Sequence, residues 1–209
     1  MIEVFMAVFI PLFIIVNPSS TLALFSAITS NYSKEERKKT AKNAAFYATI
    51  LLFIFAMAGS SILGYLQIEI YSLRIAGGIL LAFVGLDMTR RGQQFGENKP
   101  GEEQKADLAL VPLAMPSLAG PGAITVTIVS MQTLTLETSW LISLVIAFAA
   151  ILLTTAITYV IFRGSGFVIR VLGKKGMDAF TRVMGLLTVA IAIQFALTGI
   201  AEWIPTLQI

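Results

Sequence analysis

Six long apolar stretches constrain this chain more than any other feature of its sequence. They cover residues 4–28, 44–66, 71–89, 108–132, 140–162 and 179–200. Because a bilayer core about 30 Å thick needs roughly 20 apolar residues in a helix, each stretch is long enough to cross a membrane once. Hydrophobic residues make up 56% and charged residues 13% of the chain, whereas soluble domains carry roughly 45–50% and ~25%. The sequence predicts an all-α, polytopic membrane protein with six transmembrane helices.

The residue types that the chain lacks narrow its chemistry. It contains no cysteine and no histidine, which excludes disulfides, thiolate nucleophiles, and thiolate or imidazole metal ligands. Hydroxyl groups are abundant, but no general base stands near them. We therefore expect a protein that is not an enzyme and that holds no metal or cofactor. The N-terminus has Glu3, no preceding Lys or Arg and no small-x-small cleavage site, which indicates a retained span and not a signal peptide.

The basic residues predict the orientation of the chain. All but two of the 15 Lys and Arg residues fall in the first, third and fifth connections between the apolar stretches. The positive-inside rule then places these connections in the cytoplasm and both termini outside. Because topology accounts for the net charge of +3, we expect membrane lipids and no nucleic acid as partners. The remaining two, Arg74 and Arg182, lie near the starts of the third and sixth stretches and are expected to snorkel or pair near opposite surfaces.

Helix-breaking prolines fall in only two of the six stretches. Pro11 and Pro18 lie in the first, and Pro112, Pro116 and Pro121 lie in the fourth. The segment IPLF precedes NPSS as VPLA precedes AGPG, and RIAGGILLAF is similar to RVMGLLTVAI. These similarities predict two three-span repeats, residues 1–94 and 106–209, joined by a cytoplasmic linker, residues 95–105. An odd number of spans puts the two copies in opposite orientations, and inverted repeats with discontinuous helices are typical of secondary transporters.

The two breaks predict a binding site near the middle of the membrane. Asn17-Pro18 and Gly120-Pro121 each combine an N-cap residue with a proline suited to the first helical position. Amides at a helix start attract anionic groups, and the carbonyls just before them have the opposite polarity. Pro11 and Pro112 are instead expected to produce simple kinks. The predicted substrate-binding residues are Asn17, Pro18, Ser19, Ser20, Thr21, Ala119, Gly120, Pro121, Gly122, Ala123 and Thr125.

The lack of charge around both breaks predicts the class of solute. No Asp, Glu, Lys or Arg lies between Glu3 and Lys34, or between Asp107 and Glu137. Such a site suits a neutral solute, and a zwitterion such as a small amino acid matches its paired polarity. A small anion is the competing guest. We favour a secondary active transporter with alternating access, coupled to protons or sodium; the alternative is a passive channel for a small anion or neutral solute.

Two further polar side chains and two stripes of small residues are candidates for defined roles. Asp87 is either a coupling carboxylate or an interfacial ion-pair partner of the arginines that follow it. Gln194 faces either a cavity or the opposite repeat. Small residues recur at helical spacing on two stretches and predict close helix packing; they are Gly78, Ala82 and Gly85, and Gly185, Thr188 and Ala192.

The two broken stretches also carry a family resemblance. NPSSTLALFSAIT and PLAMPSLAGPGAITVTI resemble the paired signatures of the MarC family, which includes SnatA-type transporters of small neutral amino acids. The first family pattern usually reads N-P-x-G-x-x-P-x-F, and Ser20 and Ala23 stand here at its glycine and second proline. The resemblance implies gradient-driven uptake of glycine, alanine or similar amino acids across the cytoplasmic membrane of a prokaryote. Import, export and oligomeric state stay open.

Overall fold

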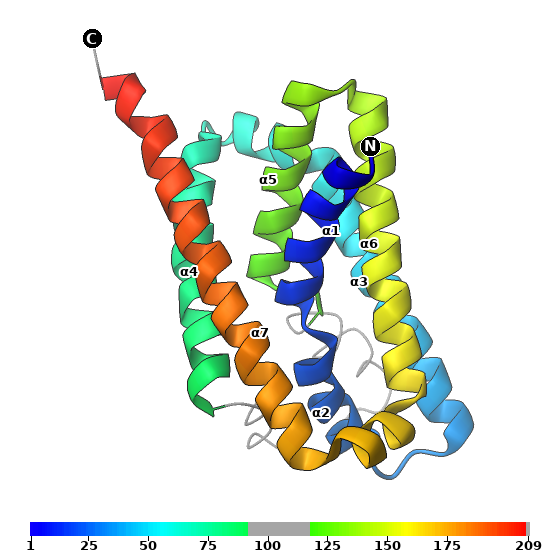
Figure 1. The fold of residues 1–209 in the computed structure, drawn as a ribbon. Helices are drawn as coiled ribbons and strands as arrows, with labels where there is room; N and C mark the ends of the chain where they lie inside the picture. The colour runs from blue at the N-terminus through cyan, green and yellow to red at the C-terminus, as the bar shows by residue number, and fades with distance from the viewer. Residues whose placement is uncertain (92–117, 208–209) are drawn as a thin grey trace.

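A computed structural model describes residues 1–91 and 118–207 of the chain, all of them in helices, turns or short connections (Figure 1). The order of elements is α1 (Ile2–Val16), α2 (Pro18–Ile28), α3 (Lys34–Tyr65), α4 (Ile70–Arg91), α5 (Pro121–Glu137), α6 (Trp140–Arg163), α7 (Ser165–Trp203) and the short 3-10 helix η2 (Ile204–Leu207). Within those ranges there is no strand, as the sequence predicts.

Five helical segments are long and apolar enough to cross a membrane. They are Ile2–Ile28, Lys34–Tyr65, Ile70–Arg90, Trp140–Arg163 and Lys175–Leu207. The predicted fourth span, residues 108–132, begins outside the described ranges, and α5 contains its second part. The linker 95–105, Asp107, Pro112 and Pro116 also lie outside those ranges.

Two predicted connections contain helix. The first basic connection belongs to α3, which begins at Lys34 because Ser33 forms a capping box: the Glu36 amide donates to Ser33 Oγ (3.3 Å), and the Ser33 amide donates to a Glu36 carboxylate oxygen (2.8 Å). In the fifth connection, α7 starts at Ser165 and is interrupted at Gly173 (φ 62°, ψ 175°), a left-handed φ that glycine adopts without strain. A short helix across the end of the bundle therefore precedes the last span (Figure 1).

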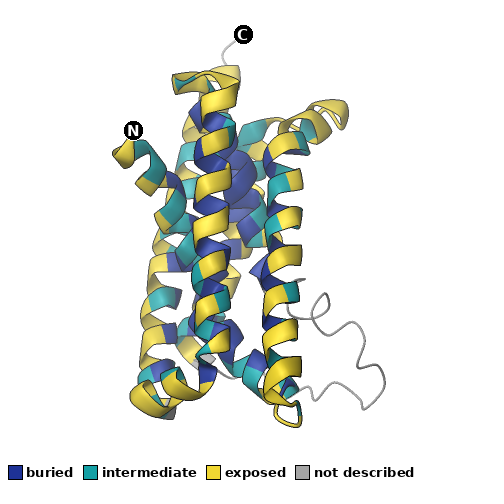
Figure 2. Cartoon of the chain, turned by 90° about the vertical axis from the view of Figure 1, so that its right-hand side faces the viewer, coloured by how far each residue is buried: buried dark blue, intermediate teal, exposed yellow. Residues whose placement is uncertain are grey.

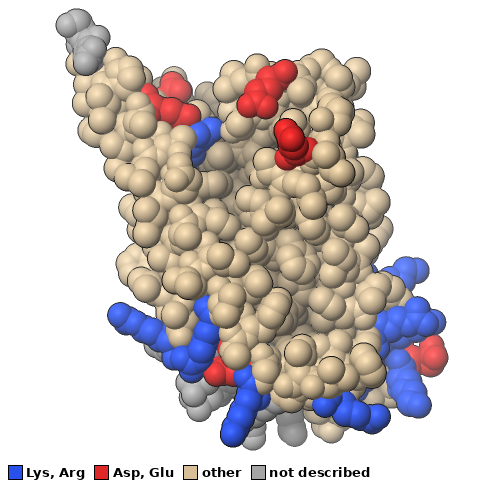
Figure 3. Space-filling view, viewed as in Figure 1, with Lys and Arg blue, Asp and Glu red and all other residues tan. Residues whose placement is uncertain are grey.

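The outside of the bundle is apolar between two polar ends. Large hydrophobic side chains such as Phe83, Val145 and Leu186 are exposed along the helices (Figure 2). Both termini lie at one end of the bundle (Figure 1). In the view of Figure 3, the basic side chains gather mainly at the other end, and a broad band without charge separates the two ends. This distribution fits a bundle whose middle is surrounded by lipid.

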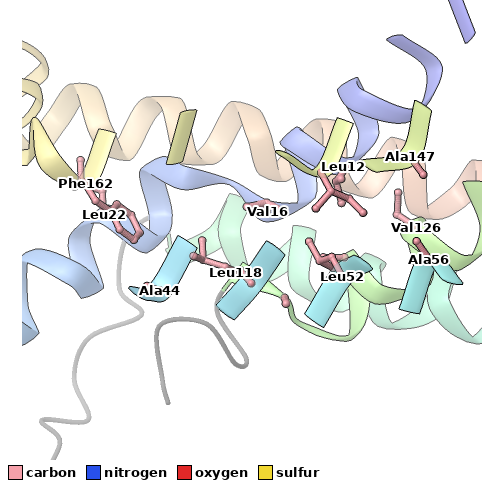
Figure 4. Packing of buried hydrophobic residues seen from close by; sticks show 14 of the residues in the cluster. Leu12, Val16, Leu22, Ala44, Leu52, Ala56, Leu118, Val126, Ala147 and Phe162 are labelled. Atoms are coloured by element: carbon pink, nitrogen blue, oxygen red, sulfur yellow. The ribbon is translucent and has the colours of Figure 1, made fainter. Parts of the chain in front are cut away.

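The core surrounds the junction between α1 and α2. Leu12, Val16 and Leu22 pack there with Leu52 of α3 and Leu118 (Figure 4). Each of these five side chains is buried. The junction of the first two helices therefore lies inside the bundle, among residues of α3, α5, α6 and α7.

Glycines allow α4 and α7 to pack along each other. The stripes of small residues predict close helix packing, and the structure shows that the two stripes pack against each other. A Cβ on Gly85 would lie 2.8 Å from the carbonyl oxygen of Gly185, and one on Gly78 would lie 2.7 Å from that of Ala192. Real Cβ atoms do not approach backbone oxygens so closely, and backbone cannot move aside as the tip of a side chain can. The short distance between the two helices therefore requires small residues at these positions.

We predict that Gly85→Ala destabilises the protein by about 1–3 kcal/mol, because the new methyl group overpacks the contact between α4 and α7. The measurement is the thermal unfolding temperature of the purified protein in detergent. Gly64→Ala in α3 is the matched control, since a Cβ on Gly64 has no neighbour within 4 Å. Equal unfolding temperatures for the two variants would contradict the proposed contact.

Candidate functional site

The first membrane-spanning segment is interrupted at one residue, Asn17, which separates α1 from α2. Its backbone has φ 42° and ψ 74°, in the left-handed region, and its amide still donates to the Phe13 carbonyl (3.1 Å). Pro18 then occupies the first position of α2. Proline disfavours a right-handed helical conformation in the residue before it, and asparagine tolerates the left-handed one. The dipeptide therefore ends one helix and starts the next, as the sequence predicts.

The Asn17 side chain is buried and incompletely paired. Only 3% of the residue is exposed. Its Oδ1 atom accepts a hydrogen bond from the Ser19 hydroxyl (2.6 Å), while its Nδ2 atom has no partner within the described residues. The side chain makes no capping hydrogen bond to the first amides of α2. A buried amide nitrogen without an acceptor costs free energy, because burial removes the water that would otherwise pair with it.

A second helix starts at Pro121. Gly120 is extended (φ −74°, ψ 174°), Pro121 is the first residue of α5, and the Ile124 amide donates to the Gly120 carbonyl (3.0 Å). No side chain caps this start either. Leu118 and Ala119, which precede it, are each 1% exposed. The arrangement matches the predicted helix start; the half of the span before Leu118 is outside the described ranges.

The two helix starts lie close together inside the bundle. A Cβ on Gly122 would lie 3.3 Å from Cγ2 of Ile15, which is two residues before the break, and 2.5 Å from Cδ2 of Leu81. Val16 and Leu118 belong to one buried cluster (Figure 4). Both starts lie partway along the length of the bundle (Figure 1). The structure thus brings the break at Asn17 and the helix start at Pro121 to the same interior region.

Most of the predicted binding residues are buried around these starts. Thr21 donates weakly to the Asn17 carbonyl (3.4 Å), and Thr125 packs directly onto Gly77 of α4, where even a Cβ would overlap it. The buried members are Asn17, Pro18, Ser19, Thr21, Ala119, Ala123 and Thr125, the partly buried members are Ser20, Gly120 and Gly122, and Pro121 is exposed.

A cavity of about 410 Å³ lies between these starts and the end that carries the termini. It extends from Glu3 to Pro11 on α1, and from Glu137 to Val129 on α5, and α7 contributes Gln194, Phe195 and Thr198. Pro11 precedes Asn17 by six residues, which correspond to about 9 Å of helix. The cavity therefore approaches the break from the end with the termini, and no residue of the predicted binding set lines it.

Two buried aromatic rings are stacked on the opposite side of the break. Phe25 of α2 stacks on Phe162 of α6 with their centroids 4.6 Å apart, and each residue is at most 1% exposed. The Arg37 guanidinium lies over the Phe25 ring at 5.8 Å and donates to the Ser165 hydroxyl (2.8 Å). Among the described residues, the cavity therefore lies on the side of the break toward the termini, and packed aromatic side chains lie on its other side.

Gln194 and Asp87, the two further polar candidates from the sequence, lie in different parts of the bundle. Gln194 lines the cavity, and its Nε2 atom donates to the Thr198 hydroxyl (3.2 Å). Asp87 is near the far end of α4, thirteen residues after Arg74, and does not line the cavity. That separation is about 20 Å along the helix. The structure therefore keeps the two candidates apart.

Arg74 lines the same cavity, with partners that the sequence did not predict. It is 8% exposed, pairs with Glu202 (2.8 Å) and donates to the Thr133 hydroxyl (2.9 Å). The sequence predicted that Arg74 pairs near a surface. It did not predict these two partners, which are far away in the sequence, or the cavity that Arg74 lines. The one available signal was a cation on the side of the membrane that the positive-inside rule leaves poor in cations.

The fold and its apolar surface define a polytopic α-helical integral membrane protein. This chain belongs to the MarC family of integral membrane proteins, whose sequence pattern matches residues 2–204. It is 38% identical over 203 residues to a UPF0056 membrane protein of Methanocaldococcus jannaschii, covering 95% of this chain and 97% of that one. It is 33% identical over 220 aligned positions to the UPF0056 inner membrane protein MarC of Escherichia coli, covering 99% of each chain. No solved structure matches the chain.

We predict that a cysteine introduced at Ser130 reacts with a water-soluble maleimide, because Ser130 lines the cavity. The parent chain has no cysteine, so mass spectrometry reports the introduced thiol alone. Ser143→Cys is the buried control, since Ser143 is 0% exposed. Labelling of both thiols at the same rate would show that the cavity is not the route by which water reaches Ser130.

Proposed function

We propose that this protein is a secondary active transporter of small neutral amino acids, with a binding site at the breaks near Asn17 and Gly120. The observation that carries the proposal is the interruption at Asn17. A left-handed residue with an unpaired side-chain nitrogen is buried in the bundle beside a second uncapped helix start. A carboxylate satisfies amide donors at a helix start, and an ammonium group satisfies the carbonyls before it.

The unlike surroundings on the two sides of the breaks support transport over a permanently open pore. A cavity reaches toward the breaks from one end, whereas the Phe25 and Phe162 rings are stacked and buried on the other side of Asn17. Alternating access requires cavity and close packing to exchange sides as groups of helices move relative to each other. We propose that the two predicted repeats, residues 1–94 and 106–209, are the inverted units that move, and that the end with the termini faces outward in the cytoplasmic membrane.

The gradient that drives transport belongs to the same proposal. Protons or sodium ions are the proposed coupling ions, and no further cofactor is required. Asp87 is a candidate for coupling because it is a carboxylate on a membrane-spanning helix. Its distance from the cavity favours the alternative role, an ion-pair partner at the basic end of α4.

Purified protein in liposomes tests the function directly. We expect labelled glycine or alanine to accumulate inside when a pH or sodium gradient is imposed, and accumulation to stop when the gradient is collapsed. Liposomes without protein are the control. A saturable chloride or fluoride current, with no accumulation of either amino acid, would favour the passive-channel alternative.

The substitution Asn17→Gly tests the role of the side chain at the break while keeping the backbone conformation. Glycine adopts the left-handed conformation freely, so the break stays while both polar side-chain atoms are lost. We expect uptake to fall about tenfold or more, the scale of one hydrogen bond to a charged group, with an unchanged unfolding temperature. Gln67→Gly is the matched control, because Gln67 is the other described non-glycine residue with positive φ (56°) and is exposed. Normal uptake by Asn17→Gly would contradict the assignment of this site.

A further inference from the structure

Arg74 is a buried cation with unused hydrogen-bonding capacity. A guanidinium carries five N–H donors, and the described contacts are with Glu202 and Thr133. Its Nε atom is buried and has no partner within the described ranges. Burying a charge is costly unless its donors are satisfied, so this site favours a ligand that supplies acceptors.

The position of Arg74 in the bundle sets it apart from the other described basic side chains. Arg182, its counterpart in the similar segment RVMGLLTVAI, has a side chain 47% exposed. That arginine pairs with Asp178 (2.9 Å) and donates to the Thr89 carbonyl (3.0 Å) near the end of α4. Arg74 instead lies in a cavity that Glu3 and Glu137 also line, and it pairs with Glu202.

The same cavity contains groups of the opposite charge. Glu3 at the start of α1 and Glu137 at the end of α5 both line it, and neither forms an ion pair with a described residue. Apolar side chains, including Val8, Leu134 and Phe195, form much of the remaining wall. A guanidinium, two carboxylates and an apolar wall are complementary to a carboxylate, an ammonium group and a small aliphatic side chain.

We propose that this cavity is a second, outer binding site for zwitterionic amino acids, separate from the helix breaks. Arg74 binds the carboxylate of the ligand through its spare donors, and Glu3 and Glu137 bind the ammonium group. The substrate class rests on the proposed function, but the residues do not overlap with those of the inner site. This outer site would capture the solute before it reaches the breaks. Pro11 is on the cavity wall, and Asn17 follows it by six residues.

Equilibrium binding to the full-length purified protein tests the outer site without any transport step. Isothermal titration would compare L-alanine with propionate, which lacks the ammonium group, and ethylamine, which lacks the carboxylate. We expect alanine to bind and each half-molecule to bind at least about tenfold more weakly, because each loses one charge-assisted interaction. Arg74→Gln and the double variant Glu3→Gln/Glu137→Gln should each weaken alanine binding by a similar factor.

Three further variants separate binding from folding. Arg182→Gln removes the counterpart arginine at the other end and should leave alanine affinity unchanged. Arg74→Lys keeps the charge opposite Glu202 but loses the planar set of donors, so it should bind alanine more weakly. Arg74→Gln/Glu202→Gln removes both members of the ion pair, and unfolding temperatures without ligand show which variants are folded.

The outcomes distinguish this inference from the proposed function. Absence of alanine binding to the parent protein, or unchanged affinity in folded Arg74→Lys and in the glutamate double variant, would overturn the outer site. Equal affinity for alanine and propionate would overturn its zwitterion selectivity. Alanine binding that depends on Arg74, in a protein that accumulates no amino acid in liposomes, would support the outer site and reject the transport function.

Discussion

The rest of the structure depends on the need to bury an interrupted helix within a membrane. In lipid, unpaired backbone groups find no water, so irregular backbone is stable only where protein or an aqueous cavity covers it. The break at Asn17 therefore cannot face the bilayer. It lies within a shell of α3, α5, α6 and α7, and the residues on either side of it, Val16 and Pro18, are buried. The surrounding helices can remain regular because their own backbone groups are paired within each helix.

Polar side chains inside this shell are largely paired with the helix on which they lie. Thr29 donates to the Phe25 carbonyl (2.7 Å), Thr127 to that of Ala123 (2.7 Å) and Thr158 to that of Thr154 (2.8 Å). Such bonds allow hydroxyl residues to be buried without a distant partner. Six buried side-chain atoms have no partner among the described residues; four are hydroxyl oxygens, and the two nitrogens, Asn17 Nδ2 and Arg74 Nε, lie beside a helix break and a cavity. Both are donors, which is why each fits an anionic group of a ligand.

The fold could be predicted from sequence to the extent that local patterns decide it. Span length, the proline positions and the preference of Asn-Pro for ending one helix and starting the next depend on nearby residues, and the break falls at Asn17 as expected. The small-residue stripes also predicted close helix packing, whereas the pairing of α4 with α7 came from the structure. The helical start of α3 was missed because charge was interpreted as a loop, although Ser33 and Glu36 carry a capping-box signal. The break at Gly173 and the short helix before it were missed because the basic residues there were also assigned to a connection.

The sequence by itself determined the class of protein: a membrane bundle of the MarC family, with helix starts at Pro18 and Pro121 and most basic residues on one side. These properties follow from hydropathy, backbone preference and charge, which act within a few residues. Only the tertiary structure decided that the two helix starts lie close together, that the rings of Phe25 and Phe162 stack on one side of the break, and that Arg74 shares a cavity with Glu3 and Glu137. Each of these contacts joins residues far apart in the chain, and their geometry depends on how the helices pack.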